Sequence, residues 1–541
     1  MTGRILGIAG PTVTVDIEGL KLYDMVRVGE AGLTGEVVRL EQGRAVVQVY
    51  EDTRGLAAHE PASGMNAPLT VQLGPGLLAG MFDGLQRPLQ RLGELCGPFL
   101  GCGSALFPLD LERKWRFFPA KREGDEVGVG DFLGHVEEEA FRHPITALHG
   151  GRIARLLDGE FTLAEPLGTL ADGREIAAVV PWPVRRERPY RRKLSPTLPL
   201  VTGQRVIDFL FPLALGGTAI FPGGFGTGKT ILEQAIAKFA AVDIVVYVGC
   251  GERGNEMAEV LEEFATLNDP WSGQPLMRRT IVVVNTSNMP VAAREASIYT
   301  AVSMAEYYRD MGYNVLLLAD SISRWAEALR EISSSLEEMP GEEGYPTYLT
   351  SRLAAFFERA GVVETLSGRI GSLSMLLSVS PPGGDFTEPV TQGCLRTAGA
   401  FFMLDTTLAH RRHFPAINWF QSYSLYEPAM IAHFNDQVSP RWGELHRRCR
   451  TLLQREESLR EVAEIVGVEG LQDADRLLMH VAERIRMEFL VQNAYTEDAF
   501  SPPEATIARI TELLAFFDRA EARLKEGAYL DELLKTVRSE E

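Results

Sequence analysis

One short run of glycines constrains the fold of this chain more than any other feature. Residues 220–237 read IFPGGFGTGKTILEQAIA, and their central part matches the pattern G-x-x-x-x-G-K-[ST]. Glycines let backbone N–H groups turn inward around a phosphate, and a following helix directs its N-terminal N–H groups at the same anion. The strand-like TAIF before the run and the helix-like TILEQAIAKFAA after it provide that context. The sequence therefore predicts a phosphate-binding loop between a strand and a helix.

The side chains of the loop indicate a nucleoside triphosphate with a metal ion. We expect Lys229 to reach the β- and γ-phosphates and the hydroxyl of Thr230 to bind Mg²⁺. A loop of glycines that binds nothing is the alternative, and its flanking strand and helix argue against it. The residues predicted to contact nucleotide in the loop are Gly223, Gly224, Phe225, Gly226, Thr227, Gly228, Lys229 and Thr230.

Acidic residues follow two apolar runs that are typical of buried strands. Asp320 ends the run LLLAD, where a carboxylate can hold Mg²⁺ through water, although it could instead cap the next element. Glu252 and Arg253 follow VVYVGCG. A carboxylate there can orient an attacking water and an arginine can meet charge on the γ-phosphate. A surface Glu–Arg turn without function is the alternative.

The pattern of apolar residues changes along the 541 residues and predicts four parts. Residues 1–70 show alternating apolar residues and glycine turns, which indicates a small N-terminal β-barrel or sandwich. Residues 71–200 are rich in Pro and Gly and indicate an irregular, partly β insert. Residues 201–430 alternate strand-like and helix-like segments, as in a parallel sheet covered by helices. Residues 431–541 are charged and have helical periodicity, which predicts a C-terminal helical bundle.

The net charge of −19 argues against a nucleic-acid-binding protein, because such proteins need a basic surface to displace counterions. The one dense basic run, residues 185–193 (RRERPYRRK), is interpreted as a solvated linker, with an interaction strip as the alternative.

The N-terminus, the apolar segments and the cysteines indicate where the protein is expected to be found. The N-terminus lacks the shape of a signal peptide, and no segment has the roughly 18 uncharged apolar residues of a membrane helix. We therefore expect a soluble protein that is not secreted. The cysteines are odd in number and lack metal-type spacing, so reduced and mostly buried thiols are expected. They are Cys96, Cys102, Cys250, Cys394 and Cys449.

Several long motifs occur in one order that resembles a known family. They are GGFGTGKT, GERGNEM, LLLADSISRWAEALREIS, MPGEEGYPTYLTSRLAAFFERAG, VSPPGGDFTEPVTQ and HFPAINWFQSYSLY. PGLLAGMFDGLQRPL precedes the insert and PWPVRRERPY follows it. In this order the motifs resemble the catalytic A subunit of V/A-type rotary ATPases over nearly the whole chain.

The resemblance implies a fold and a set of roles. The fold is multidomain α/β: an N-terminal β-barrel, a bulge insert, a RecA-like nucleotide-binding domain and a C-terminal helical domain. The resemblance makes Glu252 the expected water-activating residue and Arg253 a contact of the γ-phosphate. Phe414 and Tyr495 match the positions of an adenine pocket, with ordinary core packing as the alternative. Tyr345 lies in a motif that also nears the nucleotide in the related F-type enzymes.

The resemblance also implies partners and a cofactor. In the family, three A and three B subunits alternate in a ring, with Mg²⁺ and ATP or ADP at A/B interfaces that an arginine from the non-catalytic B subunit completes. Central-stalk and peripheral-stalk subunits connect the ring to a membrane sector that transports protons or sodium, so the chain is expected on the cytoplasmic side of a membrane. The transported ion and the net direction of ATP turnover do not follow from this sequence.

Two features depart from the family, and two other functions compete. Thr227 stands where many eukaryotic relatives have cysteine, so a disulfide switch is unavailable there, and the C-terminal region is shorter than in many A subunits. One alternative is another hexameric RecA-like motor, such as an export ATPase or a helicase; self-assembly without partners would favour it. The other is a non-catalytic nucleotide-binding member of the ring, against which the set Lys229, Thr230, Glu252 and Asp320 argues.

Overall fold

The computed structural model describes residues 1–97, 106–138, 141–530 and 533, which form two compact units. The first unit contains residues Met1–Pro196 and Val242–Ala398, and the second contains Thr197–Ala241 and Gly399–Glu541. The first therefore includes the carboxylate-bearing strand ends, and the second includes the glycine-rich loop.

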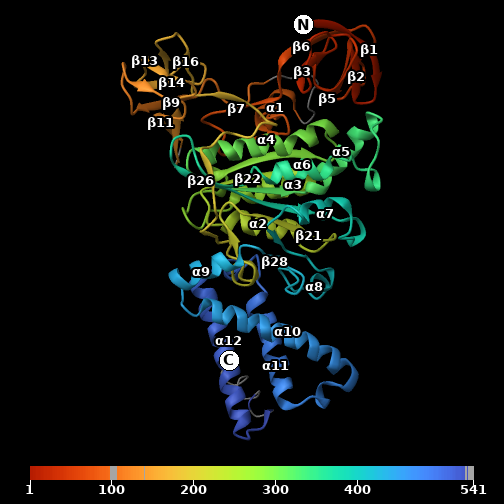
Figure 1. Cartoon of the computed structure of the whole chain (residues 1–541), viewed down its shortest axis with the longest axis vertical. Helices are drawn as coiled ribbons and strands as arrows, with labels where there is room; N and C mark the ends of the chain where they lie inside the picture. Colours follow the sequence, from red (N-terminus) through yellow and green to blue (C-terminus); the bar gives the residue numbers. More distant parts are fainter. Residues whose placement is uncertain (98–105, 139–140, 531–532, 534–541) are drawn as a thin grey trace. The chain divides into compact units, whose positions relative to one another are not determined.

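The N-terminal part of the first unit is a closed six-stranded barrel with the strand order β1-β2-β5-β4-β3-β6 (Figure 1). Val13 and Val15 alternate with polar residues, so they point into the barrel and are fully buried with Val47 on the neighbouring strand. The predicted barrel is confirmed. Its strands are β1 (Thr2–Ala9), β2 (Thr12–Val15), β3 (Asp24–Val28), β4 (Leu33–Glu41), β5 (Arg44–Val49) and β6 (Pro61–Pro68).

The insert consists of short antiparallel strands in two four-stranded sheets, with the orders β12-β11-β9-β14 and β10-β13-β15-β16. A separate pair, β7 with β17, flanks it. The strands are β7 (Thr70–Leu73), β9 (Lys114–Pro119), β10 (Glu126–Val127), β11 (Phe132–Glu138), β12 (Phe141–Thr146), β13 (Gly151–Leu156), β14 (Gly159–Thr162), β15 (Gly168–Leu170), β16 (Glu175–Ile176) and β17 (Val180–Pro183).

A parallel sheet forms the centre of the first unit, with the order β26-β24-β22-β23-β8. Its middle strands are almost entirely apolar because both faces are covered, and α4 packs on β22, β23 and β24. The strands are β8 (Met81–Asp83), β22 (Ile244–Glu252), β23 (Thr280–Thr286), β24 (Asn314–Asp320) and β26 (Ile370–Val379), with β25 (Gly361–Glu364) antiparallel to β26 and β18 (Arg192–Leu194) paired to β25. The helices are α1 (Leu89–Cys96), α3 (Gly254–Thr266), α4 (Val291–Asp310), α5 (Ile322–Ser335), α6 (Leu349–Phe357) and α7 (Pro389–Leu395).

The basic run at residues 185–193 is mostly exposed, as a solvated linker would be, but two of its arginines enter part-buried ion pairs. Arg185 places its guanidinium between the carboxylates of Glu36 and Glu295, at 2.9 and 2.7 Å. The other paired cations of the run are Arg188 with Asp310, Arg191 and Arg192 with Glu364, and Lys193 with Glu358. The linker interpretation therefore fits the exposed side chains of the run and is wrong for Arg185 and Arg188, whose guanidinium groups are part-buried in ion pairs within the first unit.

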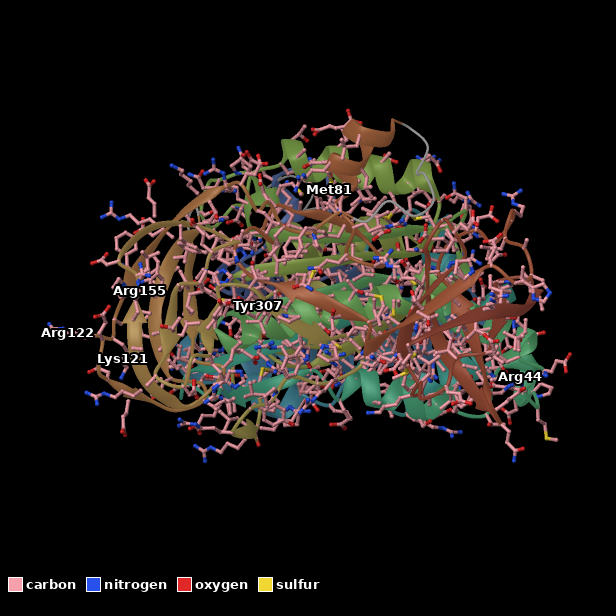
Figure 2. All side chains as sticks on the ribbon, turned by 90° about the horizontal axis from the view of Figure 1, so that it is seen from above. Arg44, Met81, Lys121, Arg122, Arg155 and Tyr307 are labelled. Atoms are coloured by element: carbon pink, nitrogen blue, oxygen red, sulfur yellow. The ribbon has the colours of Figure 1, made fainter. Side chains whose placement is uncertain are left out.

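A buried polar contact joins the insert to α4. Nδ1 of His143 lies 2.8 Å from a carboxylate oxygen of Glu138, and Nε2 lies 2.8 Å from the hydroxyl of Tyr307, which Figure 2 labels. The imidazole ring therefore bridges a carboxylate and a phenol through its two nitrogens. All three side chains are buried, and the contact fixes the position of β12 against the helix.

The second unit combines the glycine-rich loop with the C-terminal helices. Its strands β21 and β27 are parallel, and β28 pairs antiparallel to β27. Helices α10, α11 and α12 pack on one another, which confirms the predicted C-terminal helical domain. The strands are β19 (Pro199–Leu200), β20 (Leu213–Ala214), β21 (Thr218–Pro222), β27 (Ala400–Phe401) and β28 (Tyr423–Ser424). The helices are α2 (Lys229–Phe239), α8 (Thr406–His410), α9 (Glu427–Gln437), α10 (Trp442–Val466), α11 (Asp473–Arg484) and α12 (Pro503–Lys525).

Two further expectations concern membranes and thiols. Among the described residues, no helix combines the length and the apolar character that a membrane span requires. Cys250, Cys394 and Cys449 are buried free thiols, as predicted, and burial raises the pKa of Cys250 to about 12. The same prediction for Cys102 and for the side chain of Cys96 falls outside the described residues.

Candidate functional site

The glycine-rich loop joins β21 to α2 and has the backbone that its sequence predicts. Gly226 and Gly228 have φ of 79° and 82°, a left-handed conformation that other residues rarely adopt. A Cβ on Gly223 would lie 2.6 Å from the Cβ of Leu404 and 2.8 Å from the hydroxyl of Thr227. The loop therefore needs glycine at these positions, both for its turn and for close packing on its own unit.

Two side chains of the loop point back to its backbone. The hydroxyl of Thr227 donates to the carbonyl of Gly224 at 2.9 Å, and Thr227 is almost fully buried. The ammonium of Lys229 donates to the carbonyl of Gly223 at 2.5 Å and lies 3.4 Å from that of Gly224. Lys229 is the first residue of α2, so its positive charge lies at the positive end of the helix dipole. This is an arrangement that binds phosphate.

The structure places Phe414 beside the loop but leaves Tyr495 on the surface. A Cβ on Gly228 would lie 3.2 Å from the ring of Phe414, which is 37% exposed. The backbone N–H of Gln492 donates to the carbonyl of Phe414 at 2.8 Å, and this bond brings the segment that carries Tyr495 to the same part of the unit. Tyr495 is 80% exposed, and no ring contact joins it to Phe414 in the described chain. Neither side chain is packed in a core, which was the alternative for both residues, because both are exposed.

The predicted carboxylates lie at the carboxyl ends of β22 and β24 in the first unit. These strands are parallel neighbours with Gly249 opposite Asp320, so Glu252 and Asp320 leave the sheet at the same edge. Asp320 is buried and accepts a hydrogen bond from the hydroxyl of Ser378 at 2.6 Å. Asp320 therefore has one oriented carboxylate oxygen, as a metal-binding group needs.

The surroundings of Glu252 are acidic. Burial raises the pKa of Glu252 to about 7, and the charges of Asp320 and Glu256 add to the increase. Arg324 opposes them. A carboxylate with a pKa near 7 can take a proton at neutral pH far better than an ordinary glutamate with a pKa near 4.5. Glu252 therefore has the properties of a general base.

Arg253 forms the N-cap of α3 and is mostly exposed. Its guanidinium lies 3.6 Å from a carboxylate oxygen of Glu256, one turn along the helix. A surface ion pair of this length contributes little to stability.

The sequence interpretation missed three residues around the carboxylates. Ser378 follows an apolar run at the end of β26, beside β24, while Glu256 and Arg324 each lie four residues after a predicted site residue. Glu256 and Arg324 lie in the first turns of α3 and α5, the helices that follow the two strand ends, so a charged residue at the start of each helix was the available signal. Ser378 required knowledge of the strand order.

Comparison with protein families gives matches along most of the chain. Residues 203–424 match the ATP synthase alpha/beta family, nucleotide-binding domain, and residues 432–534 match the C-terminal domain of V and A type ATP synthase. Residues 106–185 match the ATP synthase alpha/beta barrel-sandwich domain, and residues 5–63 match the beta-barrel domain of the same family.

Relatives with about half of their residues identical cover almost the whole chain. The A subunit of the A-type ATP synthase of Methanopyrus kandleri is 52% identical over 98% of this chain and 92% of its own length. The V-type ATP synthase alpha chain of Anaeromyxobacter dehalogenans is 53% identical over 99% of this chain and 93% of its own. Among solved structures, the ATPase EscN of the enteropathogenic E. coli type III secretion system aligns with a TM-score of 0.68 and 21% identity, over 94% of this chain and 99% of that one. At this identity the last match concerns the fold alone.

Proposed function

The chain belongs to the ATP synthase alpha/beta family, among its V- and A-type catalytic chains, and from this premise we propose that it is the ATP-converting component of a V/A-type rotary ATPase. In this proposal the chain hydrolyses or synthesises ATP. Its fold is shared with a secretion ATPase, but the relatives that are half identical over nearly the whole length favour the rotary enzyme over the export ATPase and the helicase.

The glycine-rich loop supplies the proposed nucleotide site. Its backbone N–H groups and the N-terminus of α2 would surround the phosphates, and Lys229 would neutralise charge on the β- and γ-phosphates. The exposed ring of Phe414 beside the loop would pack on adenine, and Tyr495 would add a second ring from the neighbouring segment.

Thr230 and Asp320 are the proposed protein ligands of a magnesium ion, because each carries an oxygen group. Mg²⁺ prefers oxygen ligands and is usually held by one or two protein groups together with phosphates. Asp320 meets this requirement because Ser378 orients one carboxylate oxygen and because the residue is buried. Bound Mg²⁺ would neutralise charge on the phosphates of the nucleotide.

Glu252 is the proposed base that orients and deprotonates the attacking water. Its raised pKa lets it accept a proton near neutral pH. Arg253 would add positive charge where negative charge develops on the γ-phosphate. Phosphoryl transfer depends mainly on such positioning and charge, so no covalent intermediate with the protein is required.

We also propose that the site is shared with a B subunit in an alternating ring of A and B. Central-stalk and peripheral-stalk subunits would connect this ring to a membrane sector on the cytoplasmic side, where rotation is coupled to the transport of an ion. A site completed across an interface would couple ATP turnover to the opening and closing of that interface. The isolated chain is then expected to bind nucleotide but to turn it over slowly.

The observation that carries the proposal is the pair of Glu252, with its pKa near 7, and Asp320 at the ends of adjacent strands. The test compares ATP hydrolysis by the native A/B complex with that of a Glu252→Gln complex. We expect a loss of about 100- to 1,000-fold in turnover, because the amide cannot accept a proton, with nucleotide binding kept.

The matched control is Glu259→Gln, which removes an exposed carboxylate from α3, the helix that follows Glu252. It should leave turnover within about twofold of the native value. Full activity of the isolated chain without B would disprove the shared site, and turnover that survives Glu252→Gln would assign the base to another residue.

A further inference from the structure

A cavity of about 820 Å³ lies within the first unit, between the insert and the central sheet. Its walls come from β9, β11 and β12 of the insert and from two short stretches, residues 311–313 and 369–370, before β24 and at the start of β26. These stretches are at the amino ends of the parallel strands, whereas Glu252 and Asp320 are at the carboxyl ends. With β24 seven residues long, about 20 Å of strand separates the two places.

The chemistry of the cavity wall is unusual for this chain. Arg142 and Arg369 both line it, and none of the described residues that line it carries a carboxylate. The whole chain has 73 acidic and 54 basic residues, so a wall with two arginines and no acid is a local reversal of charge. Such a wall attracts an anion.

Aromatic rings form a second part of the wall, and small and apolar residues form the remainder. Phe118 and His135 are stacked with their ring centroids 5.1 Å apart and an angle of 17°. Arg369 lies over the ring of Phe132, 5.1 Å from its centroid, and donates a hydrogen bond to the carbonyl of Met311 at 3.1 Å. Because ring contacts and this bond hold its guanidinium, Arg369 is oriented before any ligand binds.

Tyr313 closes the wall from the side of the sheet. Its hydroxyl donates to the carbonyl of Arg142 at 2.6 Å, and its ring meets Phe141 edge to face at 5.7 Å. The contact fixes the backbone of Arg142, while the guanidinium of Arg142 makes no ion pair in the described part of the chain. Glu137 is the residue opposite Arg142 across the strand pair and is the nearest competing anion by register.

We infer that this cavity binds a small organic anion that carries a planar ring, of the aryl phosphate or nucleoside phosphate class. The two guanidinium groups pair with the phosphate, since arginine matches planar or tetrahedral oxyanions with two parallel hydrogen bonds. The rings of Phe118, Phe132 and His135 contact the planar part. The volume lies within the range of about 300 to 1,000 Å³ that is usual for small-molecule sites. A bound ligand would connect the insert to the sheet without contact with the proposed nucleotide site.

The test is a ligand-observed NMR titration of the full chain with phenyl phosphate, inorganic phosphate and benzyl alcohol. Phenyl phosphate should bind more tightly than either fragment, because only it uses both the arginines and the rings. Arg142→Gln and Arg369→Gln should each weaken its binding about tenfold, as loss of one charge-assisted pair predicts. Arg369→Lys should restore part of the affinity because it keeps the charge without the planar fork.

Three further variants locate the binding. Arg155→Gln removes an exposed arginine of β13 in the insert (Figure 2), outside the residues that line the cavity, and should change nothing. Lys229→Gln should also leave phenyl phosphate binding unchanged, since the glycine-rich loop is not the site. Glu137→Gln should tighten binding about twofold, because a competing charge across the strand pair is removed.

Two results would overturn the inference. One is no saturable binding at about 10 mM phenyl phosphate. The other is binding that Lys229→Gln abolishes and the two arginine variants leave intact. An AMP titration then separates the two classes of ligand. AMP binding that is lost in Arg369→Gln and kept in Lys229→Gln indicates a nucleoside phosphate. Tighter binding of phenyl phosphate than of AMP indicates a simple aryl phosphate. Thermal unfolding of every variant confirms that each is folded.

Discussion

Two glutamates of the first unit have opposite surroundings and opposite acidities. Glu295 on α4 accepts hydrogen bonds from Arg185 at 2.9 and 2.7 Å and from Arg352 at 3.2 Å. Burial alone would raise its pKa, but these arginines hold the pKa of Glu295 below its ordinary value. Glu252 faces Asp320 and Glu256 instead, and partial burial with these charges raises its pKa to about 7.

The difference separates a structural acid from a reactive one. A buried carboxylate paired with two guanidiniums stays ionised and fixes the position of its neighbours, so it contributes to the fold. A partly buried carboxylate among other carboxylates gains and loses a proton near neutral pH, and it destabilises the native state when it is ionised. Burial alone would raise the pKa of both glutamates, and the charge of the neighbouring residues decides whether the pKa ends above or below its ordinary value.

The largest effect is expected where the arginine of the structural network is removed. Arg185→Met leaves the buried carboxylates of Glu36 and Glu295 without their shared cation, so the free energy of unfolding should fall by about 4 to 5 kcal/mol. Chemical denaturation monitored by tryptophan fluorescence measures it. Arg186→Met, at the next and exposed position, is the control and should change stability by less than about 1 kcal/mol. Equal losses in the free energy of unfolding of the two variants would show that the ion pairs of Arg185 do not stabilise the fold.

Removing the charge of Glu252 should stabilise the protein at high pH, in contrast to the loss of stability expected for Arg185→Met. The folded pKa of Glu252 is higher than the ordinary value near 4.5, so the unfolded chain loses this proton first as the pH rises. Stability from the protonated group is complete below about pH 4.5 and is lost progressively up to about pH 7. Glu252→Gln removes this loss and should raise the free energy of unfolding at pH 8 by about 1 to 3 kcal/mol, with little change at pH 4.5. Destabilisation at pH 8 would contradict the assigned surroundings.

A smaller effect is expected at the residue that orients Asp320. Ser378→Ala removes the hydrogen bond to the carboxylate of Asp320. The Mg²⁺ concentration needed for half-maximal turnover should then rise about five- to tenfold, as the loss of one hydrogen bond to a charged group predicts. The Mg²⁺ concentration that gives half-maximal ATP hydrolysis measures the change. Ser374→Ala, a buried serine on the same strand, is the control. An unchanged Mg²⁺ requirement would mean that Asp320 does not act through the metal.

The smallest effect concerns the neighbour that raises the pKa of Glu252. With Glu252 as base, turnover of the A/B complex should fall on the acidic side of about pH 7. Glu256→Gln removes one of the charges that favour the protonated form, so this acidic limb should move down by about half a pH unit. A pH profile of turnover at saturating ATP measures both. A limb that stays fixed would mean that another group titrates.

The sequence predicted local features better than side-chain partners. The glycine-rich loop, its left-handed glycines and the apolar strands that end at Glu252 and Asp320 all follow from short stretches of chain. These features depend on local backbone geometry and on burial of both faces of a sheet. The roles of the loop residues, of Glu252, Arg253, Asp320, Phe414 and Tyr495 stay predictions, which the variants above test.

Partners distant in sequence could not be predicted in the same way. The basic run at residues 185–193 looked solvated because six cations in nine residues are usually exposed. Its partners Glu36, Glu295 and Glu364 lie between 110 and 173 residues away, so only the folded chain brings them together. Ser378 is hidden for the same reason, since its hydrogen bond to Asp320 depends on the order of β24 and β26.

The most direct test of the comparison measures the two glutamates side by side. Glu252→Gln and Glu295→Gln are each assayed for ATP turnover with B and for the free energy of unfolding at pH 8. We predict opposite results for the two variants. Glu252→Gln should lose at least about 100-fold in ATP turnover without losing stability. Glu295→Gln should lose about 3 kcal/mol in the free energy of unfolding, while its folded fraction still turns over ATP. Turnover retained in Glu252→Gln, or stability lost equally in both variants, would contradict this prediction.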